Sequence, residues 1–154
     1  MSKVVINSHE EFETFLGKVI GISDYIQITQ DQINKFADAT LDHQWIHTDP
    51  ERAKKESQFG DTIAHGYLTL SLLPYLWEEI VQFNNIKMMV NYGIEDLKFQ
   101  EPVKVNSRVC LKAELTDIKN LRGITKTFMK ATLEIEGSKK PAFTSTVVFL
   151  YHFE

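Results

Sequence analysis

Residues 38–66 concentrate the side chains that are best suited to acid–base chemistry. They contain three of the five histidines, His43, His47 and His65, and the carboxylate of Asp42 stands in the same stretch. No apolar period of helical or strand type runs through the centre of this stretch, whereas a packed element would show one. Titratable groups on an irregular loop between patterned elements are typical of a catalytic loop, although a solvated loop can have the same composition.

Two other interpretations of this loop stay open from the residues alone. Asp42 can cap a turn beside a surface histidine at position 47, without any chemistry. His43 and His47 are four positions apart, a spacing that suits zinc on a helix, and Asp49 or His65 can complete a ligand set. Because the segment lacks a helical pattern, we expect no metal there.

The size and composition of the chain indicate a single globular domain over residues 1–154. Hydrophobic residues make up 43% and charged residues 25% of the sequence, which is enough apolar surface for a core. The net charge of −4 disfavours nucleic acid as a partner, because phosphate backbones select for clustered lysine and arginine. A single cysteine, Cys110, with neither a signal peptide nor an apolar run of about 20 residues, predicts a cytoplasmic protein without a membrane span.

Local signals predict three short helices around the loop. The first covers residues 8–17, the second begins after Thr29 and ends near Ala39, and the third begins at Asp49, which precedes a proline. Serine, threonine and aspartate at the positions before these helices can accept a hydrogen bond from a free backbone N–H. The loop therefore begins where the second helix ends, and Asp49 has a structural role as a cap.

The remaining elements predict an α+β fold, in which an antiparallel sheet bends around one long helix. Residues 63–83 are apolar on nearly every side, which is typical of a buried helix, and Pro74 should bend it. Alternating apolar and polar residues then predict strands, and turn residues between the later ones predict antiparallel hairpins. The expected strands cover residues 19–29, 86–93 with 97–99, 108–115, 126–135 and 143–153.

Two motifs resemble those of a known family. They are FADATLDHQWIHTDPERA, residues 36–53, and TIAHGYLTLSLLP, residues 62–74. Both are similar to the MaoC-like dehydratases, the group that contains (R)-specific enoyl-CoA hydratases and nodulation protein N, and the resemblance runs from about Ile20 to the end. It implies a hot-dog fold, in which the sheet wraps around the long helix. It also implies an active site at the interface of a homodimer or larger homo-oligomer.

The same resemblance implies roles for four residues. Asp42 and His47 would be the catalytic pair that adds water to a trans-2-enoyl thioester, giving a (3R)-3-hydroxyacyl thioester. The N–H of Gly66 would bind the thioester oxygen, with His65 as a support beside it. The chain is thus expected to be a hydro-lyase without a cofactor, whose substrate carries coenzyme A or a carrier protein. A hot-dog acyl-CoA thioesterase and a non-catalytic acyl-thioester binding module are the alternatives.

Three residues depart from the pattern of the hydratases beside the expected catalytic pair. Leu41 precedes Asp42 where the hydratases commonly have glycine, and a glycine there permits a backbone angle that leucine resists. Gln44 and Trp45 take the places of Asn-Pro, as in the nodulation-protein branch. Both reacting groups are present, so these departures bear on the shape of the loop and on substrate preference.

Overall fold

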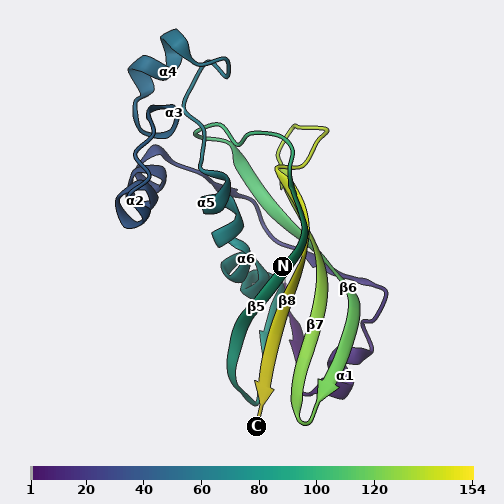
Figure 1. Ribbon diagram of the computed structural model, residues 1–154. Helices are drawn as coiled ribbons and strands as arrows, with labels where there is room; N and C mark the ends of the chain where they lie inside the picture. The colour runs from purple at the N-terminus through teal and green to yellow at the C-terminus, as the bar shows by residue number, and fades with distance from the viewer. Residues whose placement is uncertain (1) are drawn as a thin grey trace.

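One antiparallel sheet lies against two consecutive helices in the computed structural model, which describes residues 2–154 (Figure 1). The order of its strands is β2-β6-β7-β8-β5, and β3 also pairs with β6. The strands are β2 (Val19–Ile22), β3 (Ile26–Gln27), β5 (Ile86–Phe99), β6 (Arg108–Leu121), β7 (Ile124–Ile135) and β8 (Phe143–Phe153). The predicted α+β architecture, a sheet around a helix, is therefore confirmed.

The strands β6, β7 and β8 form two successive antiparallel pairs, as the turn residues predicted. Arg122 and Gly123 join β6 to β7 with φ angles of 54° and 94°, the left-handed conformations that a tight hairpin turn uses. Alternate residues point into the core, and Leu111, Met129 and Leu133 are at most 1% exposed. The period-2 pattern thus predicted these strands and their buried face, although β6 continues to Leu121 and not to the expected end at residue 115. The single strand expected at residues 19–29 is divided into β2 and β3.

The long helix that we expected is divided into two helices. α5 (Gly66–Ser71) and α6 (Leu73–Ile80) meet at Leu72, and Pro74 lies in the first turn of α6. Proline has no N–H for the helical hydrogen-bond ladder and fits the first turn of a helix, so a new helix begins beside it. The predicted boundaries at residues 63 and 83 are both wrong.

A strand replaces the predicted last turn of that helix. β4 (Val81–Phe83) pairs in parallel with β1 (Val4–Ile6), a pairing that the sequence analysis did not predict. Stretches of three residues carry no readable period, and their conformation is decided by the partner with which they pair.

The helix α6 supplies the centre of the core. Leu76 and Trp77 are fully buried, and Trp77 Nε1 donates a hydrogen bond to the hydroxyl of Tyr151 at 2.9 Å. Another face of the two helices is open, because Tyr67 and Tyr75 are 70% and 52% exposed. The prediction of a helix buried on all sides is therefore wrong for this face.

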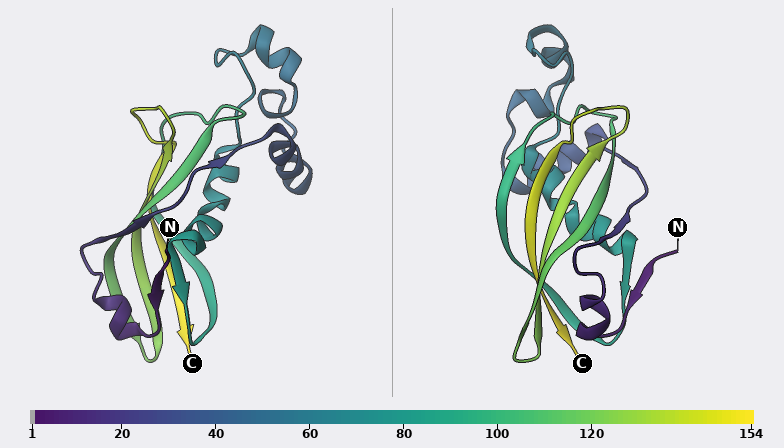
Figure 2. Two further views of the ribbon diagram at one scale, coloured as in Figure 1. Left: turned by 180° about the vertical axis from the view of Figure 1, so that it is seen from behind. Right: turned by 90° about the vertical axis from the view of Figure 1, so that its right-hand side faces the viewer.

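Three further helices form a lobe beyond one end of the sheet, next to the start of α5 (Figure 2). They are α2 (Gln30–Thr40), α3 (Trp45–Thr48) and α4 (Pro50–Glu56), whereas α1 (His9–Glu13) lies near the opposite end. The predicted caps are confirmed. The backbone N–H groups of Glu11, Gln32 and Arg52 donate to the side chains of Ser8, Thr29 and Asp49 at 3.2, 3.2 and 3.0 Å. None of the helices within residues 2–154 has the length and apolar character needed to cross a membrane.

Candidate active site

His47 lies in α3, a single helical turn within the stretch that we expected to be irregular. Its side chain is buried, and its Nδ1 lies 2.7 Å from the carbonyl oxygen of Ile63. A carbonyl oxygen only accepts hydrogen bonds, so Nδ1 carries the proton and Nε2 keeps its lone pair. The contact with Ile63 thus leaves Nε2 able to accept a proton.

Asp42 follows directly after the C-terminus of α2. The helix ends at Thr40, and the φ of 65° and ψ of 16° of its C-cap, Leu41, place that residue in the left-handed region. This is the backbone angle that glycine adopts readily at a helix end and leucine resists, as the sequence predicted. The Asp42 side chain, which follows this turn, is 54% exposed.

His65 connects the two residues. Its ring is almost fully buried, its Nε2 donates to the backbone carbonyl of Asp42 at 3.0 Å, and the Asp42 carboxylate lies 3.9 Å away. The ring of His65 stacks on that of His47, with centroids 3.9 Å apart and an interplanar angle of 24°. One polar atom from each of the three residues lies within 4.8 Å of the others.

The surroundings of His47 favour its neutral form. Burial lowers the pKa of the imidazole below its ordinary value, and the neighbouring His65 acts in the same direction. The Ile63 carbonyl and the Asp42 carboxylate oppose this by stabilising the protonated ring, but burial outweighs them. His47 is thus suited to accept a proton near neutral pH.

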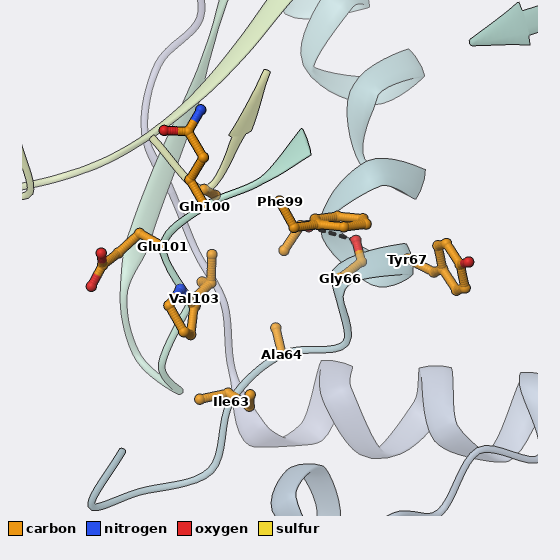
Figure 3. Close-up of a pocket in the computed structure, with 11 residues that line it drawn as sticks. Ile63, Ala64, Gly66, Tyr67, Phe99, Gln100, Glu101 and Val103 are labelled. Atoms are coloured by element: carbon orange, nitrogen blue, oxygen red, sulfur yellow. Dashed lines mark hydrogen bonds between the residues drawn. The ribbon is translucent and has the colours of Figure 1, made fainter. Parts of the chain in front are cut away.

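Gly66 is the first residue of α5, directly after His65. The N–H groups at the start of a helix have no acceptor within the helix, so they can bind a ligand oxygen. A pocket of about 340 Å³ opens beside Gly66, and Phe99 and Val103 line it (Figure 3). A Cβ on Gly66 would lie 3.0 Å from the Phe99 ring, so the absent side chain keeps the backbone accessible.

The three titratable residues fit a metal ion poorly. Nδ1 of His47 and Nε2 of His65 carry the protons that they donate to carbonyl oxygens. The lone pairs of the two remaining nitrogens lie in nearly parallel, stacked ring planes. They therefore do not converge on one ion at the distance of about 2.0 Å that a zinc–nitrogen bond requires.

Comparison with known proteins decides the family. The family described as MaoC like domain matches residues 11–137. The chain belongs to the MaoC-like dehydratases. Among the curated relatives of this MaoC-like protein, 3-hydroxyacyl-thioester dehydratase Z of Mycobacterium tuberculosis is 44% identical over 136 residues, 88% of this chain and 89% of that protein. Nodulation protein N of Rhizobium meliloti is 41% identical over 148 residues, 95% of this chain and 92% of that protein.

A solved structure supports the fold of this MaoC-like domain independently. The (R)-hydratase from A. caviae superposes with a TM-score of 0.69 at 23% identity, covering 86% of this chain and 95% of that chain. The predicted hot-dog fold is confirmed.

The MaoC-like fold brings together the four residues that the sequence singled out, Asp42, His47, His65 and Gly66. His43 is not among them, because it is exposed and its Nε2 lies 3.7 Å from the Asp38 carboxylate. Gln30, whose side-chain amide contacts the backbone of His47, was not predicted from the sequence. A glutamine in the first turn of a helix is ordinarily exposed to solvent, so nothing in the sequence indicates this contact.

Proposed function

We propose that this protein is an (R)-specific enoyl-thioester hydratase, a hydro-lyase that adds water to a trans-2-enoyl thioester and yields the (3R)-3-hydroxyacyl thioester. The observation that carries the proposal is the proximity of the Asp42 carboxylate to a buried His47 whose Nδ1 is held by the Ile63 carbonyl. Two groups that can exchange protons with one water are what this addition needs. The names and folds of the relatives support the same reaction.

The chemistry divides among three groups. Asp42 and the free Nε2 of His47 hold one water between them, its oxygen bonds to carbon 3, and one of its protons passes to carbon 2. Because the pair shares a water, we assign proton transfer to Asp42 and His47 together. The N–H of Gly66 stabilises the negative charge that develops on the thioester oxygen.

The substrate is an acyl thioester, with coenzyme A or a carrier protein as its handle, and no metal or cofactor takes part. The pocket beside Gly66 has apolar walls from Phe99, Val103 and Ala142, which suits an alkyl chain. Gln100 and Glu101 also line this pocket and supply its polar groups. An apolar pocket with a few polar groups is typical of small-molecule sites.

The functional unit that we propose is a homodimer formed through the free edge of β5. This strand ends the sheet, and its apolar side chains Met88, Val90, Tyr92 and Ile94 are 38–61% exposed. They lie on both faces of the strand, because Met88 and Val90 pair with His152 and Leu150, whereas Ile94, beyond a bulge, pairs with the core residue Val147. An uncovered apolar edge strand invites pairing with another chain. The exposed Tyr67 and Tyr75 on the adjoining helices extend this surface, and a second copy would cover the half-exposed site.

Turnover of crotonyl-CoA, followed as loss of the enoyl absorbance, tests the reaction. Asp42→Asn and His47→Gln should each reduce turnover by about 100-fold or more. His43→Gln, on the same loop but away from the pair, should leave it unchanged. A (3S)-specific hydroxyacyl-CoA dehydrogenase should not oxidise the product. No hydration of CoA or carrier-protein thioesters of several chain lengths, or an Asp42→Asn variant as active as wild type, would refute the proposal.

The two alternatives make different predictions. An acyl-CoA thioesterase would release free thiol from a saturated acyl-CoA, which a thiol reagent detects. A binding module would gain thermal stability from acyl-CoA without forming product. A binding module gives no reason for a buried histidine to be held in one tautomer beside a carboxylate. A thioesterase would use such a pair to activate water, so the products separate it from a hydratase.

A further inference from the structure

Gln30, the first residue of α2, joins the two segments that carry the candidate site. Its Nε2 donates to the backbone carbonyl of His47 at 2.7 Å, and its Oε1 accepts from the hydroxyl of Thr62 at 2.5 Å. Nε2 also donates to Asn34 Oδ1 at 2.9 Å. The carbonyl of His47 can only accept, so the amide nitrogen must face it, and the orientation of the amide is fixed.

The two contacts of Gln30 are made with the two segments that the hydrogen bond between His47 Nδ1 and the Ile63 carbonyl connects. His47 Nδ1 donates to Ile63, and Ile63 follows Thr62 directly in the chain. The backbone N–H of Ile63 also donates to the carbonyl of Ile46 at 3.0 Å. Gln30, His47, Ile63 and Thr62 thus form a closed ring of covalent and hydrogen bonds, in which Gln30 joins the two segments beside the Ile63–Ile46 backbone bond.

Burial makes this bridge difficult to replace with water. Thr62 is fully buried, and the contacts from Gln30 to both partners are partly buried. Loss of the amide would leave the hydroxyl of Thr62 and the carbonyl of His47 without their partner. An unsatisfied buried polar group is unfavourable, so the two segments would shift to find other partners.

The geometry points to Gln30 as a positioning residue for His47. Its amide holds residues 47 and 62 at the separation that keeps Nδ1–H on the Ile63 carbonyl, and thereby keeps Nε2 unprotonated toward Asp42. Gln30 acts through the backbone of His47 and not on the substrate. The kinetic consequence rests on the proposed function, whereas the effect on the His47 tautomer does not.

Gln30→Met tests this role, because methionine has a similar length and no hydrogen-bonding amide. Nitrogen-15 spectra of labelled histidine should show His47 protonated at Nδ1 in the wild type and a mixture of tautomers in the variant. With enoyl-CoA, kcat should fall about 10- to 100-fold, because small misplacements of a reacting group are costly. KM should stay within about twofold, because substrate binding is untouched.

Matched variants separate positioning from general destabilisation. Gln32→Met makes the same change two positions along α2 and should leave tautomer and kcat unchanged. Thr62→Ser keeps the hydroxyl that Gln30 binds and should behave as wild type. Thr62→Val removes that hydroxyl and should shift both readouts in the same direction as Gln30→Met. If Gln30→Met does not fold, the nitrogen-15 spectrum of His47 and the kcat of Thr62→Val test the role of Gln30 in its place.

A folded Gln30→Met variant with the wild-type tautomer and kcat would overturn the inference. So would a loss of kcat without any change in the His47 spectrum. If the wild type hydrates no enoyl thioester, the proposed function fails, and the spectrum of His47 still decides the role of Gln30.

Discussion

The imidazole rings of His47 and His65 lie stacked, with their centroids 3.9 Å apart. Two such rings repel each other when both are charged, so the neighbouring His65 lowers the pKa of His47. His65 also holds the backbone of Asp42 through its Nε2. Through this stack, His65 connects the position of the Asp42 carboxylate to the protonation state of His47.

The first prediction concerns the pH dependence of activity. The pKa of His47 lies below the ordinary histidine value of about 6.5, so the neutral base persists below that pH. The acid limb of kcat/KM should have its midpoint below pH 6.5, which a pH–rate profile measures. A midpoint at or above 6.5 that disappears in His47→Gln would contradict the lowered pKa.

The same shift predicts the pH dependence of stability. Unfolded His47 binds a proton near pH 6.5, and folded His47 only at lower pH, so the unfolded state holds more protons between these values. The contribution of His47 to the free energy of unfolding should therefore decrease as pH falls from about 6.5 through the folded pKa. Urea titrations of wild type and His47→Gln at several pH values isolate this contribution.

The second prediction concerns Leu41. Its left-handed backbone costs a non-glycine residue about 1–2 kcal/mol, and its side chain is 81% exposed, so the side chain contributes little burial in return. Leu41→Gly should raise the free energy of unfolding by about 0.5–1 kcal/mol, after allowing for the greater flexibility of unfolded glycine. Ala39→Gly, in the same helix but with right-handed backbone, should lower it by about 1 kcal/mol. A Leu41→Gly variant less stable than wild type in urea would refute this account.

Local chemistry was enough to predict much of the fold. The caps at Ser8, Thr29 and Asp49 depend on a side chain and a backbone N–H three residues later, so they are visible in the sequence. The later strands follow from alternation along their own length. The pairing of β1 with β4 and the true ends of α5 and α6 depend on contacts between distant segments, which no local pattern reports.

The candidate site was predictable only in part. The motifs predicted Asp42, His47, His65 and Gly66, and the fold brings all four together, although their catalytic roles stay predictions. Gln30 was not predictable, because it contacts His47, which is 17 positions away, and Thr62, which is 32 positions away. These contacts use a backbone carbonyl and a hydroxyl group, which leave no signature in the sequence. The absence of a cofactor and the cytoplasmic location also stay predictions.

The third prediction tests the proposed dimer. Ile94 is 46% exposed on β5, and a glutamate there would place a charge at the edge through which the two copies would pair. Ile94→Glu should give a monomer by light scattering after gel filtration, and turnover should fall with it. Leu121→Glu introduces the same charge at a side chain that is 45% exposed at the β6–β7 turn, and should stay dimeric. A wild-type monomer with full activity would exclude the proposed interface.

The last prediction uses the contact between Gly66 and Phe99. A Cβ at residue 66 would lie 3.0–3.3 Å from three atoms of the Phe99 ring, and that ring is 47% exposed and can move by a few tenths of an ångström. Gly66→Ala should therefore fold, yet its kcat/KM should fall about tenfold or more, because the methyl group stands where the thioester oxygen approaches the N–H. Adding Phe99→Leu distinguishes the two causes when the double variant is compared with Phe99→Leu alone, because Phe99 also lines the pocket. If the methyl group blocks the substrate, the double variant stays impaired; recovery of kcat/KM would instead assign the loss to the displaced ring and remove the support for Gly66 as the oxyanion donor.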